Sequence, residues 1–393
     1  MNIGRTVFSQ LIDYIDEYVF KTIVDNHHGN SRVRHFTCWE QFLCMFFAQL
    51  TNRESLRDVE TCLRAVGTKL YHAGIRSRVS RSTLAEANER RPWLIYHDLA
   101  QHLIQEARQL YRNEKLFAEI TTAVYAFDST TIDLCLTLFP WAHAAVYKKT
   151  NAAIKVHTLF DVQQKIPTFI RISAAMVHDV NFMDALVYEP GAFYVFDRGY
   201  IDFSRLKRID TEKAFFVIRA KRSLRFTRIE SLQVDKTTGI MVDQKIKLDV
   251  YYSLRDYPDS LRRIKYCDRE HDQTYVYLTN NFVLSAFTIA QLYRARWKIE
   301  IFFKWIKQHL RIKSFFGTSS NAVKTQIWIA VSVYVLVAIM RKKLNVDLSL
   351  YTILLQILSI SLFEKVPMFQ LLTENQPHFL TSPNDNQLNL FNL

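Results

Sequence analysis

A single carboxylate stands among cations in residues 286–313. Tyr293, Arg296, Glu300 and Lys307 share one stripe about 60° wide if this stretch is helical, because each residue turns a helix by about 100°. The last twenty residues of the stretch contain seven Lys and Arg and no acid besides Glu300. Such an excess of positive charge attracts a polyanion. The plainer alternative is an amphipathic helix whose charged side is only solvated.

The same stretch is expected to form one helix that packs on a core. Apolar side chains recur along it at helical spacing and give it one apolar face. These side chains are Leu292, Ala295, Ile299, Phe302, Phe303, Ile306 and Leu310. The charged stripe lies beside this face.

Two further acids each follow a short apolar run. Residues 123–127 (AVYAF) precede Asp128, and residues 192–196 (AFYVF) precede Asp197. Such runs are typical of buried strands, and acids at strand ends meet at the edge where open α/β folds place their chemistry. Together with Glu300 they suit phosphodiester chemistry in which carboxylates hold two Mg²⁺ ions about 4 Å apart. Each acid alone could equally be an exposed or paired structural residue.

The elements around these acids indicate an α/β fold with a mixed sheet. Up to about residue 115 the apolar spacing is helical. Beyond it, strands are expected at residues 154–160, 166–172 and 214–220, and helices at 180–187 and 202–209. Residues 221–282 are β-rich, with strands expected at 245–250 and 273–278.

The N-terminal helical region contains a basic loop. Lys69, Arg76, Arg78 and Arg81 lie in it without an acid. Ser82 or Thr83 can cap the short helix that follows. A basic loop that leads into a capped helix is typical of a helix-turn-helix-like DNA reader. A helical bundle with a basic loop is the alternative.

The spacing Tyr293-x2-Arg296-x3-Glu300-x6-Lys307 resembles the YREK signature of the bacterial insertion-sequence transposases of family four. A chance match to four fixed residues is rare. The signature therefore favours an enzyme over a solvated helix.

Two other motifs strengthen the resemblance. AFDSTTI around Asp128 is similar to the family's first acidic motif, and FDRGY around Asp197 is similar to the second. The similarity covers residues 117–340 specifically and the N-terminal helical region more loosely. It implies an RNase H-like catalytic core with a DDE metal site.

The reaction that the resemblance implies is cut-and-paste transposition of the element that encodes the protein. Asp128, Asp197 and Glu300 would be catalytic and would ligate two Mg²⁺ ions, for which Mn²⁺ can substitute. Water would free a 3′-hydroxyl at each element end, and this hydroxyl would attack the opposite strand to give a hairpin. The hairpin would be reopened before joining to target DNA.

Five residues are expected to contact DNA. The resemblance assigns Tyr293, Arg296 and Lys307 to the phosphates of the element end, a role for which cationic side chains are suited. Trp297 could stack on a base turned out of the duplex, or could be a core tryptophan. Arg198, next to the second acid, could approach a phosphate.

The expected organisation has six parts. They are a helical N-terminal DNA-binding domain (residues 1–116), the first part of the catalytic core (117–220), a β-rich insertion (221–284), the second part of the core with the Glu300 helix (285–345), C-terminal helices (346–376) and a flexible tail (377–393).

Composition narrows the partners and the compartment. A net charge of +13 indicates a polyanionic partner, either nucleic acid or an acidic membrane surface. Five scattered cysteines without a CxxC pair indicate no disulfide framework and no zinc site. Residues 327–340 and 348–363 are apolar but too short to span a bilayer, so we expect buried helices and no membrane. A bacterial, nucleoid-associated, cytoplasmic protein without a signal peptide is expected.

The expected partners are the terminal inverted repeats of its own element, target DNA and a second copy of the chain in a synaptic homodimer. The tail sequence QLNLF resembles peptides that dock on the replication sliding clamp through residues equivalent to Gln387, Leu388, Leu390 and Phe391. Two other classes remain open. One is a catalytically silent DNA-binding protein derived from a transposase, and the other is a membrane-associated protein built on the C-terminal apolar helices.

Overall fold

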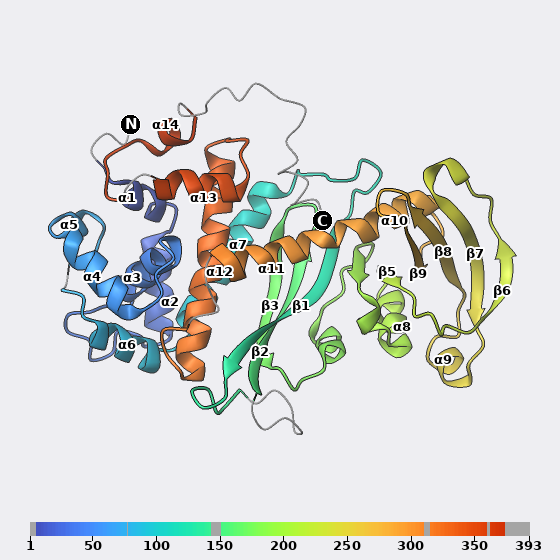
Figure 1. The fold of residues 1–393 in the computed structure, drawn as a ribbon, viewed down its shortest axis with the longest axis horizontal. Helices are drawn as coiled ribbons and strands as arrows, with labels where there is room; N and C mark the ends of the chain where they lie inside the picture. Colours follow the sequence, from blue (N-terminus) through green and yellow to red (C-terminus); the bar gives the residue numbers. More distant parts are fainter. Residues whose placement is uncertain (1–4, 77, 143–150, 310–314, 360–361, 374–393) are drawn as a thin grey trace.

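The computed structural model describes residues 5–76, 78–142, 151–309, 315–359 and 362–373. Within them the chain is a mixed α/β protein. A body of helices lies at one end of a long sheet, and helices α11 and α12 lie where the two meet (Figure 1).

The N-terminal part of the described chain is helical, as expected. Its helices are α1 (Val7–Ile12), α2 (Glu17–Asn26), α3 (Cys38–Leu50), α4 (Leu56–Val66), α5 (Lys69–His72), α6 (Arg81–Arg90) and α7 (Leu94–Tyr111). Reciprocal capping boxes, Thr37 with Glu40 and Ser55 with Asp58, begin α3 and α4. The prediction of the α6 cap was wrong by two or three residues.

Ser80 caps α6 in place of Ser82 or Thr83. Its hydroxyl accepts the Thr83 N–H at 3.2 Å, which is the contact expected of an N-cap residue three positions before its donor. Ser82 and Thr83 lie within the first turn and are exposed.

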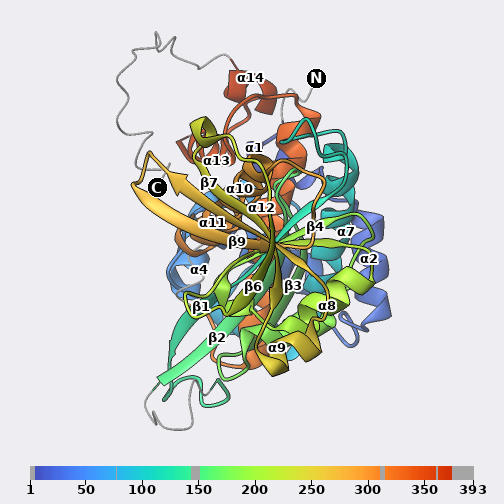
Figure 2. The same ribbon diagram turned by 90° about the vertical axis from the view of Figure 1, so that its right-hand side faces the viewer.

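One sheet of nine strands runs through the described chain in the order β3-β2-β1-β4-β5-β9-β8-β7-β6. The strands are β1 (Val124–Cys135), β2 (Asn151–Asp161), β3 (Ile166–Ala174), β4 (Phe193–Phe196), β5 (Phe215–Arg219), β6 (Phe226–Ser231), β7 (Ile240–Leu248), β8 (Leu261–Asp268) and β9 (Gln273–Thr279). β1, β4 and β5 are parallel, and the other pairs are antiparallel. Because β9 pairs with β5, the β-rich segment lengthens the central sheet, which Figure 2 shows to be strongly twisted.

The remaining elements connect the strands or follow them. They are the 3₁₀ helices η1 (Asp179–Ala185), η2 (Arg198–Tyr200) and η3 (Lys236–Thr238), and the helices α8 (Phe203–Thr211), α9 (Tyr251–Asp256), α10 (Ala286–Ala295), α11 (Trp297–His309), α12 (Ser320–Lys343), α13 (Leu350–Ser359) and α14 (Met368–Thr373). The helix expected at residues 180–187 is thus the 3₁₀ helix η1.

Helix α12 is the centre of the helical body. It packs on α3, α6, α7, α11 and α13, and its residues from Ala322 to Met340 are almost all buried. The Tyr111 hydroxyl of α7 donates to the Ala338 carbonyl at 2.9 Å. Among the described helices, α12 alone is long and apolar enough to cross a membrane, and 94% of its apolar window is covered by the protein itself. Its hydrophobicity is therefore accounted for by internal packing.

The first described helix is bonded to the last described segment. The amides of Val7 and Phe8 donate to the carbonyls of Glu364 and Leu362 at 2.9 and 2.8 Å. Gln10 donates to one carbonyl of the same segment and accepts from one of its amides. Residues 362–368 therefore help to hold α1 in the helical body.

The prediction of one continuous helix over residues 286–313 was wrong. Helix α10 ends at Ala295 and α11 begins at Trp297, with Arg296 between them. The Arg296 amide bonds to the Tyr293 carbonyl three residues back, a tightened turn of the 3₁₀ type. The expected apolar face is buried at both ends of this break, for example at Leu292 and Ile299. Residues 310–313 lie outside the described residues.

Candidate active site

Asp128 and Asp197 occupy matching positions on two neighbouring parallel strands. The last paired residues of β1 and β4 are Phe127 and Phe196, so each aspartate is the next residue along its chain. Asp197 follows the end of β4, as expected. Asp128 does not end its strand, because β1 continues to Cys135 along β2 after it has left β4. The acids thus meet where β1 and β4 separate.

Arg296 ties strand β1 to helix α11. Its Nη1 donates to Asp128 Oδ2 at 2.9 Å and its Nη2 donates to Glu300 Oε1 at 2.7 Å. The residue is only 8% exposed. Burying an unpaired charge is costly, so the guanidinium and the two carboxylates stabilise one another.

Tyr293 holds Asp197, the carboxylate that Arg296 does not contact. Its hydroxyl donates to Asp197 Oδ1 at 3.0 Å. Its ring packs 4.6 Å from the ring of Tyr277, and the Arg296 guanidinium lies 5.7 Å from its centroid. Burial raises the pKa of Tyr293, so the phenol keeps the proton that it donates.

The other expected DNA contacts are spread around this centre. Lys307 Nζ donates to the Thr131 carbonyl at 2.7 Å, on β1 just beyond the first acid. Trp297 is 49% exposed, so the alternative of a core tryptophan was wrong. Arg198 is exposed in η2, directly after Asp197. The structure brings Tyr293 and Arg296 onto the carboxylates and places Trp297 and Arg198 at the surface.

The carboxylates suit a divalent cation by their chemistry. Burial raises the pKa of Asp128 to about 6, against the opposing effects of Arg296 and of the Ser129 N–H, and the nearby Glu300 and Asp197 raise it further. Carboxylate oxygens are the ligands that Mg²⁺ prefers in proteins. A positive ion would relieve the crowding of negative charge that disfavours ionised Asp128.

The three carboxylates do not form one close group of ligand atoms in the structure. Among the described residues, no choice of one oxygen each from Asp128, Asp197 and Glu300 brings all three within 4.8 Å of one another. Arg296 lies between the first and the last. An ion bound by both Asp128 and Glu300 would compete with the guanidinium for these carboxylates.

A closer group of metal-capable side chains lies at the turn between β8 and β9. It consists of Asp268, Glu270 and His271. His271 Nδ1 lies 3.0 Å from Asp268 Oδ2, and Glu270 pairs with Arg294 at 2.6 Å. These contacts already compensate the charges of the group.

A second polar network, missed in the sequence, begins at the residue after Asp128. The Ser129 amide donates to Asp128 Oδ1 at 2.8 Å, and its hydroxyl donates to Asp179 Oδ1 at 2.9 Å. Lys155 Nζ lies 3.1 Å from the same Asp179 oxygen. His157 is fully buried and lies opposite Ser129 on β2. Its Nδ1 lies 3.6 Å from Asp179 Oδ1. The only sequence signal was that Ser129 belongs to the first acidic motif.

Two family models match the chain. Residues 120–336 match the transposase DDE domain, and residues 3–76 match a domain of unknown function (DUF4372). The first match spans more than half of the chain and contains Asp128, Asp197 and Glu300. The chain therefore belongs to the DDE transposase family, which confirms the family class expected from the motifs.

Individual relatives agree with this assignment. The chain is 35% identical over 263 residues to a putative transposase (y4zB) of Sinorhizobium fredii, across 65% of this chain and 70% of that one. It is 28% identical over 276 residues to a probable transposase for insertion sequence element IS5377 of Geobacillus stearothermophilus, across 69% and 71%. A solved piggyBac transposase synaptic complex with hairpin DNA aligns at a TM-score of 0.43 and 12% identity, over 97% of this chain and 86% of that one.

Proposed function

We propose that the chain is the transposase of an insertion sequence, cutting DNA at the ends of its own element and joining them to target DNA. The observation that carries the proposal is the arrangement of the three acids within the transposase-matching region. Asp128 and Asp197 follow paired residues of β1 and β4, and Arg296 joins Asp128 to Glu300 of α11. The strand order β3-β2-β1-β4-β5, antiparallel up to β1 and parallel beyond it, supports an RNase H-like core.

DDE transposase domains use divalent metal ions, generally Mg²⁺. In this chain Asp128, Asp197 and Glu300 would hold them, as two Mg²⁺ ions with Mn²⁺ able to substitute. When bound, the ions would activate the attacking oxygen and stabilise the leaving oxygen. The protein orients the ligands itself, since Tyr293 holds Asp197 and the Ser129 amide holds Asp128.

Cationic and aromatic side chains around the carboxylates would position the DNA. Arg296 and Lys307 would take phosphates of the element end, and Arg198 would take one beside Asp197. The exposed Trp297 would stack on a base turned out of the duplex near the hairpin. Each step exchanges one phosphodiester oxygen for the oxygen of water or of a 3′-hydroxyl, so hydrolysis and hairpin formation require no nucleotide cofactor.

The assembly follows from the same function. Two copies of the chain would pair two inverted repeats in a synaptic homodimer. Each copy would have the six-part domain organisation given above. The protein would act in the cytoplasm, at the nucleoid. Docking on the sliding clamp would use Gln387, Leu388, Leu390 and Phe391, which lie outside the described residues. Deleting residues 387–393 should then abolish clamp binding without affecting DNA cleavage in vitro.

The decisive experiment is excision from a donor plasmid that carries the gene with its native flanking DNA. In Mg²⁺, wild type should release the element with hairpin ends, and Glu300→Gln should not. Glu17→Gln, which removes an exposed acid at the start of α2, is the matched control. Excision by Glu300→Gln at the wild-type rate would refute the site.

The same experiment excludes or supports the second candidate function. A catalytically silent DNA-binding protein is favoured by one observation, the occupation of Asp128 and Glu300 by Arg296. If wild type binds the flanking DNA and never cuts it, in Mg²⁺ or in Mn²⁺, this candidate replaces the first.

A further inference from the structure

Residues 61–85 carry an excess of positive charge. The segment contains no Asp or Glu and five cations, all exposed: Arg64, Lys69, Arg76, Arg78 and Arg81. Arg64 pairs with Glu60 one turn before it. Within the described part of the chain, no carboxylate lies within 4.0 Å of the other four. An ordinary solvated helix face would show more mixed charge.

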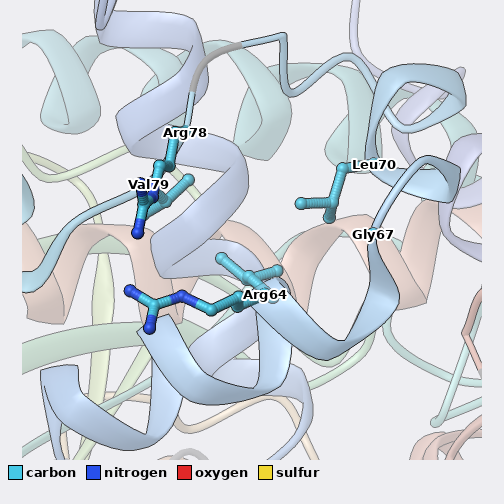
Figure 3. A pocket seen from close by; sticks show the side chains of 6 residues that line it. Arg64, Gly67, Leu70, Arg78 and Val79 are labelled. Atoms are coloured by element: carbon cyan, nitrogen blue, oxygen red, sulfur yellow. The ribbon is translucent and has the colours of Figure 1, made fainter.

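Two of these arginines face one hollow. A cavity of about 380 Å³ lies between α4, α5 and the segment that leads into α6, and its lining residues are Leu63, Arg64, Gly67, Leu70, Arg78 and Val79. Figure 3 shows the guanidinium groups of Arg64 and Arg78 on the same side of the hollow, with Leu70 across from them. The two cations come from different elements, so folding creates the site.

The backbone around the hollow leaves room for a ligand. Gly67, with φ +62°, turns the chain after α4 and leaves open space where a Cβ would stand. Val79 is followed by Ser80, which caps α6, so the positive end of that helix dipole lies next to the hollow. Two guanidinium groups and the start of α6 thus border a hollow whose other lining residues are apolar or glycine.

We propose that this two-arginine pocket binds a backbone phosphate of duplex DNA, and that α4 to α6 hold the element end outside the catalytic site. The inference rests on the proposed function and extends it. A planar guanidinium suits a phosphate oxygen, and two of them around one phosphate fix the position of the duplex without reading its sequence. The proposal gives the expected N-terminal DNA-binding domain a specific phosphate contact.

The test is DNA binding by the full chain in EDTA, measured by fluorescence anisotropy on a duplex of the element's own end sequence. Arg64→Ala and Arg78→Ala should each weaken binding about tenfold, as expected for a lost charge-assisted hydrogen bond. The double variant should lower the slope of log affinity against log salt by about one, the value for one phosphate. An unrelated duplex of equal length should lose affinity by the same factor.

Arg112→Ala is the matched control, because it removes one exposed arginine at the C-terminal end of α7 and should change neither affinity nor slope. Arg78→Lys keeps the charge and should retain most of the DNA binding. Comparison with Arg78→Ala then shows whether the loss in Arg78→Ala comes from the missing contact or from misfolding. Wild-type affinity and slope in the double variant would overturn the proposal. So would loss of inorganic phosphate binding with full retention of DNA binding, or an effect confined to the end sequence.

Failure of this proposal and failure of the proposed function are distinguishable. Binding in EDTA does not depend on catalysis, so a protein that never cuts DNA can still show the loss at Arg64 and Arg78. Conversely, excision that requires Glu300 can coexist with unchanged binding in these variants.

Discussion

Arg296 donates one hydrogen bond to Asp128 and one to Glu300, so a single guanidinium joins strand β1 to helix α11. Both partners are proposed metal ligands, and Arg296 is itself a proposed phosphate contact. A DNA phosphate that draws Arg296 away would free the carboxylates for an ion. Binding of DNA and binding of metal would then strengthen each other by the same factor.

The first prediction is that end DNA tightens Mn²⁺ binding about tenfold in the wild type, within the usual range of such coupling. Arg296→Gln should bind Mn²⁺ more tightly than wild type without DNA, because the competing cation is gone, and DNA should add little. Calorimetry with an end duplex that lacks the 3′-hydroxyl measures both affinities without reaction. Equal Mn²⁺ affinity of the two DNA-free proteins would contradict the competition.

The second prediction concerns the stability of the metal-free protein. Burial raises the pKa of Asp128 to about 6, above the value of about 3.9 in an unfolded chain. The folded state therefore binds this proton more tightly, so the group stabilises the fold in acid and the stabilisation is lost as pH rises from about 4 through about 6. Acidification from pH 7 to 4 should raise the free energy of unfolding of wild type relative to Asp128→Asn by at most about 3 kcal/mol.

Urea unfolding of both proteins at several pH values measures this difference. Asp161, whose pKa burial also raises to about 6, is present in both and cancels. Saturating Mg²⁺ at pH 7 should restore the stability that ionised Asp128 costs the fold, since an ion favours the ionised carboxylate. A stability difference that does not vary with pH would contradict the assignment.

The third prediction separates Trp297 from the fold. Because its side chain is half exposed, Trp297→Ala should change the free energy of unfolding by less than about 1 kcal/mol, as is usual for surface substitutions. Loss of stacking on a turned-out base should nevertheless lower hairpin formation about tenfold or more, since such stacking contributes about 1–3 kcal/mol. First-strand nicking should persist, and Trp297→Phe should keep most of the hairpin yield. Equal loss of nicking and of hairpin formation would argue against stacking.

The fourth prediction is that Asp179 positions the first catalytic acid. Through Ser129 it fixes the backbone of β1 next to Asp128, so Asp179→Asn should slow cleavage about tenfold, the effect of roughly 1.4 kcal/mol. Affinity for end DNA should stay the same. Asp184→Asn is the control, because Asp184 belongs to the same 3₁₀ helix but pairs with Arg205 at the surface.

Substitution of Ser129 tests whether Asp179 acts through the hydrogen bond between them. Ser129→Ala should slow cleavage by a similar factor, and the double variant should be no slower than either single one, because both changes break one link. Additive losses would show that Asp179 acts by another route.

Local pattern was enough to place one acid on β1, one directly after β4 and one on α11, because apolar runs and helical spacing are properties of the chain itself. The length of β1 was not visible. The residues after Asp128 are largely polar, and they become a strand because β2 pairs with them. The break at Arg296 was equally hidden, since no Pro or Gly marks it and the guanidinium is held by a carboxylate on a distant strand. Asp179 was missed because its partners come from β1 and β2.

The bonds between α1 and residues 362–368 have a consequence for how the protein forms. Ribosomes make α1 more than 350 residues before its partners, so the helical body cannot be completed until residues 362–368 have been synthesised. A prematurely terminated chain keeps the residues of the N-terminal helices but not the contacts that seat α1. Translation through residue 368 is thus a requirement for a finished helical body.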